Sequence, residues 1–383
     1  MAGPRSLELF CRVVDNFGDI GVCWRLARQL ADEHGLAVRL WVDDLASFRR
    51  ICAALDVGAQ AQHLQGVAVC RWDDDIGEQD VADAVVDAFG CTLPAAYLVA
   101  MAARTGQRQA APAWINLEYL SAEDWVAGCH GLPSPHPQLP LTRYFFFPGF
   151  VKGTGGLLEE AGLAQRRAAF TADPAQQAAF LAGLGVVPLP GDYLMSLFCY
   201  PAAPVARLLD ALCDDARPSL VLVPEGVAVA ALAGWAGRAL VPGERIRRGN
   251  LTLQGVPFLD QPDYDRLLWC CDLNVVRGED SMVRAQWAQK PFVWHIYPQQ
   301  EDAHRIKLDA FLDHFLDGLA PDAADACRAA WHAWNGDGDL RAKWPAFRDA
   351  LPALDAHMPG WCERLRVQGD LASNLLSFIK RVR

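Results

Sequence analysis

One stretch of the sequence combines an arginine, a glycine and a helix start, which are the components of an anion site. Arg277 to Ser281 follows an apolar run that reads as a strand, Leu267 to Val276, and precedes residues with helical spacing, Met282 to Trp287. Either Asp280 or Ser281 could cap this helix. The N–H groups of a helix start beside an arginine suit a phosphate or diphosphate. The same residues also fit an ordinary capped helix whose arginine pairs with a neighbouring carboxylate.

Two aspartates four residues apart form a second candidate site. Asp15 and Asp19 lie between a predicted strand, Leu7 to Val14, and a predicted helix, Val22 to His34. Paired carboxylates can do general base work, one taking a proton while the other orients the substrate or tunes the pKa. A structural role, with Asp15 shaping the turn and Asp19 capping the helix, fits equally well.

A nucleotide could be held by side chains that follow strands of the second half of the chain. Phe198 and Tyr200 end one predicted strand, and Phe258 and Gln261 follow another. An aromatic ring can stack on a nucleobase, a glutamine can bond its edge, and a tyrosine hydroxyl can reach a phosphate. Burial in the core is the usual alternative for such rings.

Alternating strands and helices predict an α/β protein of two domains. The 383 residues are too many for one ordinary core, and 52% hydrophobic with 21% charged residues indicate packed structure. We expect the first domain over residues 1–170 and the second over 185–360, with a connecting segment at Gly131 to Pro148 and a flexible linker at Gly153 to Gly156. Further strands of the first domain are predicted at Ala68 to Trp72, Tyr97 to Met101 and Trp114 to Leu117.

Several classes of function are disfavoured by composition and motifs. The net charge of −11 argues against nucleic acid and anionic membranes, and no apolar stretch is long enough to span a bilayer. Twelve cysteines without a C-x-x-C, and a pair His295 and His304 that matches no metal spacing, make a metal site unexpected. The turn after the first strand lacks G-x-G-x-x-G, so a nicotinamide enzyme is disfavoured. A cytoplasmic protein without metal or cofactor is expected.

Seven stretches, taken in order, resemble the bacterial protein-arginine rhamnosyltransferases that modify elongation factor P. They cover nearly the whole chain: Val14 to Leu26, Trp41 to Asp44, Ile115 to Ser121, Phe198 to Tyr200, Tyr264 to Trp269, Arg277 to Ser281, and Trp294 to Gln299. The resemblance implies a GT-B fold, in which two Rossmann-like domains face each other across a cleft and a C-terminal helix, within residues 361–383, joins the first domain. It also implies a metal-independent, inverting transfer of rhamnose from TDP-β-L-rhamnose to an arginine of elongation factor P.

The resemblance further assigns roles to residues. Asp19 becomes the general base and Asp15 its partner in orienting the guanidinium, while Glu279 supports the chemistry or holds the sugar. Because it lies beside the proposed base, Asn116 to Ser121 is expected to form an acceptor-facing edge, with a plain buried strand end as the alternative. The nucleotide sugar is assigned to residues of the second domain: Phe258 stacks on thymine, Gln261 bonds its edge, Phe198 lines the pocket, and Tyr200, Arg277, Asp280 and Ser281 hold ribose and diphosphate. The alternative is a non-catalytic or differently directed nucleotide-sugar-binding protein of the same fold.

Overall fold

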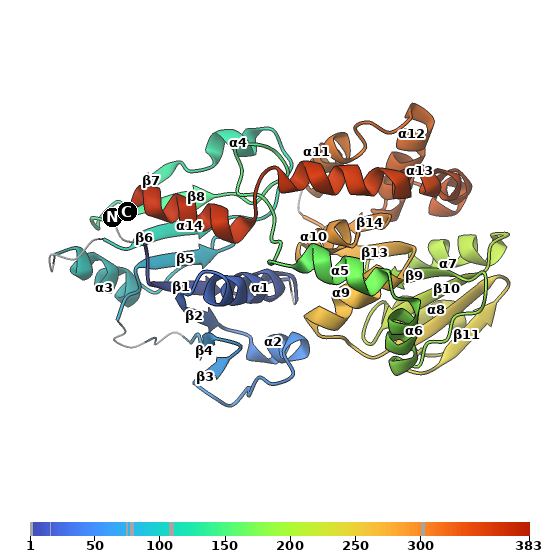
Figure 1. Ribbon diagram of the computed structural model, residues 1–383, viewed down its shortest axis with the longest axis horizontal. Coiled ribbons are helices and arrows are strands. Elements are labelled where there is room, and N and C mark those ends of the chain that lie inside the picture. Colours follow the sequence, from blue (N-terminus) through green and yellow to red (C-terminus); the bar gives the residue numbers. More distant parts are fainter. Residues whose placement is uncertain (1–2, 16, 74–75, 77–79, 107–110, 300–302) are drawn as a thin grey trace. The chain divides into compact units, whose positions relative to one another are not determined.

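The chain divides into two units, each with its own sheet (Figure 1). The computed structural model describes residues 3–15, 17–73, 76, 80–106, 111–299 and 303–383, so Asn16 of the first motif stretch lies outside the described residues. Unit 1 comprises residues 1–161 and 364–383, and unit 2 comprises residues 162–363. The sequence placed the corresponding boundaries at 170 and 361.

The sheet of unit 1 is mainly parallel and has the strand order β3-β4-β2-β1-β5-β6-β8-β7. When the antiparallel edge strands β3 and β7 are left out, the order is β4-β2-β1-β5-β6-β8. Renumbered from 1 to 6 along the chain, these six strands lie in the order 3-2-1-4-5-6, which is that of a doubly wound Rossmann sheet. The order reverses between β1 and β5, and ligands of such sheets bind beyond the strand carboxyl ends at this switch point. The strands are β1 Ser6–Cys11, β2 Ala37–Val42, β3 Ala61–Leu64, β4 Val67–Arg71, β5 Ala84–Ala88, β6 Ala113–Leu117, β7 Pro133–Pro135 and β8 Thr142–Phe146.

Helices cover this sheet, and one of them was predicted as a strand. Tyr97 to Met101 lies inside helix α3, where Tyr97 and Met101 are four residues apart and share the buried face. A short apolar run has no clear period, which is why it was misread. The strand that follows β4 in the chain is instead β5, which the sequence reading missed. The helices of unit 1 are α1 Gly18–Asp32, α2 Leu45–Ile51, α3 Ala95–Gly106, α4 Trp125–Cys129 and α14 Leu371–Val382.

The segment predicted as a connection and a flexible linker is part of the packed unit. The aromatic residues Tyr144 to Phe146 form the end of β8, which pairs in parallel with β6. Gly155 N donates to Phe147 O at 2.7 Å, and a Cβ on Gly156, whose φ is +71°, would lie 2.2 Å from Gly369 O. These glycines therefore allow two backbones to touch, and the linker prediction is wrong.

The C-terminal helix α14 packs on unit 1 beside α1, in the domain that the family resemblance implied for it. Leu375 and Ile379 are fully buried. Asp370 caps the helix by accepting Ser373 N at 3.0 Å and also accepts Gln29 Nε2 of α1 at 3.1 Å. Burial of the apolar face supplies most of the stabilisation of such a helix.

Unit 2 repeats the Rossmann plan with the sheet order β11-β12-β10-β9-β13-β14. When the antiparallel edge strand β11 is left out, the order is β12-β10-β9-β13-β14. Renumbered along the chain, this is 3-2-1-4-5, and the switch point lies between β9 and β13. The strands are β9 Tyr193–Leu197, β10 Ser219–Pro224, β11 Arg245–Arg248, β12 Leu251–Val256, β13 Leu273–Arg277 and β14 Phe292–His295. The helices are α5 Leu163–Thr171, α6 Pro174–Gly183, α7 Val205–Asp214, α8 Val229–Ala236, α9 Gln261–Cys270, α10 Asp280–Ala288, α11 Ala303–Phe315, α12 Pro321–Trp334 and α13 Leu340–Arg366, whose end belongs to unit 1.

The apolar run before the anion turn was predicted as one strand, but its first half is helical. Leu267 to Cys270 ends α9, and only Leu273 to Arg277 forms β13. Asp260 fixes the start of α9 by accepting Asp263 N at 2.9 Å. Leu267 and Leu268 are fully buried, so hydrophobicity on every side hid the helical period.

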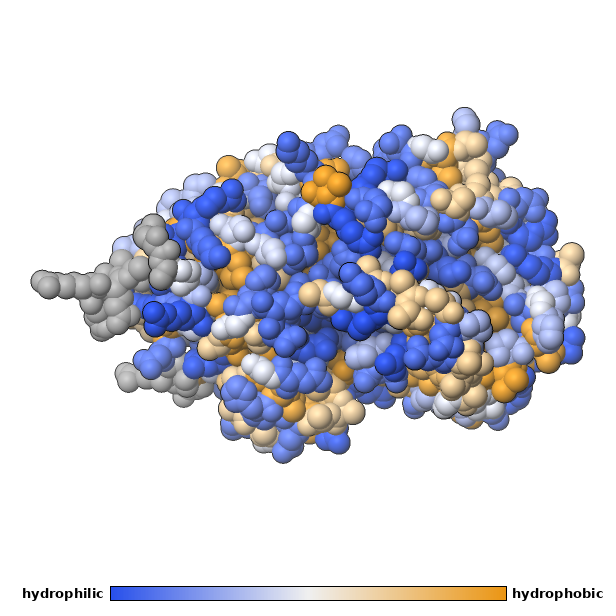
Figure 2. Space-filling model, viewed as in Figure 1, coloured by the Kyte–Doolittle hydropathy of each residue, from blue (hydrophilic) through white to orange (hydrophobic). Residues whose placement is uncertain are grey.

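Hydrophobic side chains are mostly inside the two units. All twelve cysteines are free thiols, and most are buried. The face in Figure 2 is predominantly hydrophilic, with hydrophobic residues scattered over it. Among the described residues, no helix has the length and apolar character needed to cross a bilayer.

Candidate active site in two half-sites

The paired aspartates lie in the turn that follows β1, at the switch point of unit 1. Asp19 is 2% exposed, and its Oδ2 accepts the N–H groups of Val14 and Asp15, both at 2.8 Å. Gly18 N donates to Asp15 O at 2.6 Å, and a Cβ on Gly18 would lie 2.6 Å from Asp15 Oδ2. The N-cap residue of α1 is Phe17, so the Asp19 side chain braces the preceding turn and does not serve as the helix cap.

Burial gives Asp19 the character of a stronger base. Desolvation raises the pKa of its carboxyl above the ordinary aspartate value, and the negative charge of Asp15 adds to the rise. The N–H groups of Asp15 and Val14, and the hydroxyl of Tyr119, oppose the rise by hydrogen bonding to the carboxylate. A carboxylate with a raised pKa takes a proton more readily than an exposed one.

The stretch predicted to face the acceptor is largely occupied in structural contacts. Asn116 Oδ1 accepts Gly90 N at 3.2 Å, and its Nδ2 donates to Glu118 Oε1 at 2.6 Å. Ser121 Oγ donates to Glu123 Oε2 at 2.9 Å. The contact of this stretch with an acceptor stays a prediction.

The anion turn of unit 2 has the expected strand, glycine and helix order but a different cap. Gly278, with φ +62°, turns the chain from β13 into α10, and Trp294 Nε1 donates to its carbonyl at 2.9 Å. Glu279 is the N-cap residue, so the prediction of Asp280 or Ser281 as cap is wrong. The Ser281 hydroxyl donates to Arg277 O and accepts Arg277 N at 3.2 Å, which closes the turn from inside.

Arg277 contacts two of the predicted nucleotide-binding rings. Its Cζ lies 4.6 Å from the ring centroid of Phe198 and 4.7 Å from that of Tyr200, and its Nη1 donates to Cys199 O at 3.3 Å. Cation–π contacts of this kind attract the guanidinium to the rings and so help to fix its position. The three residues therefore form one cluster at the switch point between β9 and β13.

His295 completes this cluster as a neutral residue. Its Nδ1 accepts Tyr200 N at 3.1 Å, and it is the register partner of Arg277 across β13 and β14. Burial first, and then the Arg277 charge, lower the pKa of His295 to about 4. His304 likewise accepts a backbone N–H, from Gln299 at 3.2 Å. Within the ranges described above, no group of three or more His, Cys, Asp or Glu side chains could hold a metal.

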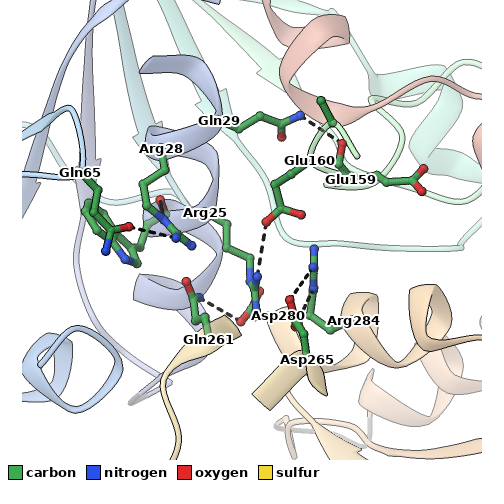
Figure 3. A network of polar contacts seen from close by, with 12 residues as sticks. Arg25, Arg28, Gln29, Gln65, Glu159, Glu160, Gln261, Asp265, Asp280 and Arg284 are labelled. Atoms are coloured by element: carbon green, nitrogen blue, oxygen red, sulfur yellow. Dashed lines mark hydrogen bonds and ion pairs between the residues drawn. The ribbon is translucent and has the colours of Figure 1, made fainter. Parts of the chain in front are cut away.

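Two polar contacts join the helices that begin at the remaining predicted residues (Figure 3). Gln261, which begins α9, donates from Nε2 to Asp280 Oδ2 at 3.2 Å, and Asp280 begins α10. One turn further along both helices, Arg284 binds Asp265 through Nε at 3.0 Å and Nη2 at 2.6 Å. The half-buried Phe258 lies in the loop before Gln261. These contacts fix the two helix starts relative to each other.

The residues assigned by sequence thus fall into two sets. Unit 1 brings Asp15 and Asp19 together, whereas Glu279, assigned to the same chemistry, belongs to unit 2. Sequence reasoning missed His295, Tyr264, whose ring centroid lies 5.7 Å from that of Phe198, and the pair of Asp265 with Arg284. The spacing could have revealed this pair. Asp265 stands four residues after Gln261, and Arg284 stands four residues after Asp280, and residues four apart lie on the same face of a helix.

The two Rossmann-type sheets define the class of protein. A glycosyltransferase from Rickettsia africae has a similar fold, with a TM-score of 0.51 at 9% identity over 100% of this chain and 97% of that chain. The protein has an α/β glycosyltransferase fold, as the sequence predicted.

Closer similarities identify the family. The model of the family "Elongation-Factor P (EF-P) rhamnosyltransferase EarP" matches residues 7–380. A protein-arginine rhamnosyltransferase of Pseudomonas putida is 52% identical over 97% of this chain and 98% of its own, and one of Neisseria meningitidis is 35% identical over 94% and 91%. A solved structure, described as the structural basis for EarP-mediated arginine glycosylation of translation elongation factor EF-P, is 39% identical, with a TM-score of 0.70 over 99% of both chains. The chain belongs to this family of protein-arginine rhamnosyltransferases and is a glycosyltransferase.

Proposed function

We propose that this protein transfers rhamnose from TDP-β-L-rhamnose to an arginine side chain of translation elongation factor P, in one inverting displacement with Asp19 as base. The observation that carries the proposal is the family match over residues 7–380, which includes the candidate residues of both units. The residues of unit 1 suit the acceptor, and those of unit 2 suit the donor. An acceptor that works in translation also favours a cytoplasmic location.

The acceptor is the harder reactant, and the chemistry of unit 1 suits it. A guanidinium has a pKa above about 12 and delocalised lone pairs, so it is a poor nucleophile. Asp15 and Asp19 would bind its N–H groups and localise the charge on one side. Asp19, whose pKa is raised, would take the proton from the attacking nitrogen as the C–N bond forms.

The donor needs a site that stabilises the leaving diphosphate, and unit 2 supplies positive groups for it. As the bond from the anomeric carbon to the diphosphate oxygen breaks, negative charge grows on TDP. Arg277, held by Phe198 and Tyr200, and the N-terminal end of the α10 dipole would stabilise this charge without a metal ion. Attack from the opposite side inverts the anomeric carbon and gives an α-linked product.

The remaining donor contacts follow from the start of α9 and from the turn. Phe258 would stack on thymine and Gln261 would bond its edge. Asp280 and Ser281 would hold ribose or diphosphate, although Ser281 already closes the turn onto Arg277. Glu279, the N-cap residue of α10, would support the sugar.

The test is the intact mass of elongation factor P after incubation with the protein and TDP-β-L-rhamnose, followed by fragmentation. We expect one deoxyhexose on one arginine. Asp19→Asn should reduce turnover by at least about a hundredfold, in the range typical of a lost general base, while TDP binding by calorimetry stays unchanged. Asp44→Asn is the matched control, because Asp44 caps α2 in the same unit and asparagine caps a helix equally well.

Each negative result removes a different part of the proposal. If the mass of elongation factor P is unchanged while TDP binds, the acceptor is another molecule. If Asp19→Asn turns over at the wild-type rate, Asp19 is not the base. If neither TDP nor TDP-rhamnose binds, the donor assignment is wrong.

A further inference from the structure

One peptide group after β9 is held from both sides by residues of two other strands. Its carbonyl, that of Cys199, accepts Arg277 Nη1 from the end of β13 at 3.3 Å. Its N–H, that of Tyr200, donates to His295 Nδ1 from the end of β14 at 3.1 Å. The C=O and N–H of a trans peptide point in opposite directions, so Arg277 and His295 bond opposite edges of the same group. Both side chains therefore fix its orientation.

The bond from His295 spans the end of β13, because β14 is not a neighbour of β9. The sheet order places β13 between them, and Arg277 and His295 are register partners across β13 and β14. Because Nδ1 of His295 is the acceptor, the neutral ring carries its proton on Nε2. Tyr200 and His295 are both buried, and a buried N–H that loses its acceptor is costly. The bond thus ties together the two strand ends that flank the Arg277 turn.

Asn335 fixes the strand end from which His295 reaches. β14 is an edge strand of the sheet, and Asn335 is the C-cap residue of α12. Its Oδ1 accepts Ile296 N at 3.1 Å and its Nδ2 donates to Trp294 O at 2.9 Å, so one side-chain amide binds the backbone on both sides of His295. Nδ2 also donates to Trp331 O at 2.9 Å, which anchors the amide to the last turn of α12. The side chain takes the place of a further strand at this open edge.

We propose that His295 and Asn335 are positioning residues for Arg277 in the transfer of rhamnose. Asn335 fixes the end of β14, His295 fixes the peptide group after β9, and the carbonyl of this group holds the Arg277 guanidinium. The inference rests on the proposed role of Arg277, which is to stabilise the leaving diphosphate of the donor. A guanidinium that is fixed before the donor binds loses little freedom on binding, so more of its attraction for the diphosphate appears as affinity.

The first test is the affinity for TDP, measured by calorimetry, in His295→Phe. Phenylalanine keeps a ring against Tyr200 and Trp334 and removes the acceptor, so the peptide group is released on one side. We expect the Kd for TDP and the KM for TDP-β-L-rhamnose to rise about tenfold, the effect of one net hydrogen bond. The KM for elongation factor P should not change. Wild-type affinity for TDP, or an equal rise in both KM values, would overturn the proposal.

His295→Asn separates the acceptor from the ring. Asparagine Oδ1 and histidine Nδ1 are both bonded to Cγ, so the amide oxygen can accept Tyr200 N although the ring is lost. The affinity of this variant for TDP should therefore lie close to that of the wild type. Equal losses in His295→Asn and His295→Phe would mean that the ring matters and its acceptor does not, which contradicts the proposal.

The matched control is His130→Phe in unit 1. His130 Nδ1 accepts Phe147 N at 3.1 Å, so this substitution removes the same kind of bond at the same length. It should lower the urea midpoint and leave the affinity for TDP unchanged. A loss of TDP affinity as large as that of His295→Phe would assign both effects to stability, and the positioning role would be rejected.

Asn335→Asp tests the second positioning residue. Aspartate keeps the size and one acceptor of asparagine but loses the N–H groups that bind Trp294 O and Trp331 O. The affinity for TDP should fall in the same direction as in His295→Phe. Wild-type affinity in Asn335→Asp would overturn the role of Asn335.

Arg277→Gln separates this inference from the proposed function. If Arg277→Gln binds TDP as tightly as the wild type, the donor role of Arg277 is wrong, and the positioning roles fall with it. If Arg277→Gln binds TDP weakly and His295→Phe binds it normally, the donor role stands and only the positioning is rejected. Because His295 is proposed to act through Arg277, His295→Phe should weaken binding no further in the Arg277→Gln background. Additive losses in the double variant would show that His295 does not act through Arg277.

Discussion

Replacing Asp265 by asparagine should strongly destabilise unit 2. Asp265 of α9 and Arg284 of α10 form a two-point ion pair, and their side chains are only 7% and 2% exposed. Asparagine has nearly the same shape and retains one acceptor oxygen, so packing changes little. The substitution removes the negative charge of Asp265 from beside the buried Arg284 guanidinium, and arginine cannot shed its proton at accessible pH.

The magnitude follows from the burial of the pair. Removing one partner of a buried ion pair typically costs about 3–5 kcal/mol, mostly the penalty of an uncompensated buried charge. For a domain of about 200 residues, this corresponds to a melting temperature lower by roughly 10 °C.

Urea unfolding followed by tryptophan fluorescence measures the effect. The matched control is Asp263→Asn on the same helix, because its pair with Arg266 is exposed (side-chain accessibilities of 41% and 49%) and should contribute less than about 1 kcal/mol. A loss below about 1 kcal/mol for Asp265→Asn, equal to that of the control, would refute the reasoning. It would mean that water reaches the pair in solution.

Two further predictions concern unit 1. Gly156→Ala should cost about 2–4 kcal/mol in the free energy of unfolding, because its Cβ would meet Gly369 O at 2.2 Å. The control is Gly35→Ala, which has a similar φ of +66° but no atom within 4 Å of the new Cβ, and it should cost about 1–2 kcal/mol. Equal losses in urea titrations would contradict the close approach of Gly156 to Gly369. Burial raises the pKa of Asp87 to about 7, against the charge of Arg143. Folding therefore favours its protonated form, and this contribution is complete below about pH 4 and lost as pH rises towards 7. The urea midpoint of the wild type should fall over that range relative to Asp87→Asn, and parallel curves would contradict the shift.

Local pattern was sufficient for much of the fold. The strand predicted at Leu7 to Val14 and the helix predicted at Val22 to His34 overlap β1 and α1, because apolar runs and helical spacing are properties of neighbouring residues. The errors arose where every residue is apolar. Tyr97 to Met101 and Leu267 to Cys270 are helical because their burial is set by partners distant in the chain, which a short run does not reveal.

The candidate site was predictable in its residue types more than in its contacts. Asp15, Asp19 and Arg277 were singled out because charged side chains in turns after strands can do chemistry. A structural role fitted them as well, and only the family resemblance favoured the functional one. The contacts of Arg277 with the rings of Phe198 and Tyr200 join residues some 80 positions apart. No spacing in the sequence encodes such a contact.

The sequence by itself determined the family, the alternation of strands and helices, and the turns that hold the candidate residues, because these depend on residue types in local order. Tertiary structure decided which strands are neighbours. The reversal between β1 and β5, and between β9 and β13, creates the two edges where the candidate residues gather. Tertiary structure also raises the pKa of Asp19. The cause is desolvation, which depends on how completely the folded chain surrounds the carboxyl group and not on the residues beside it in sequence.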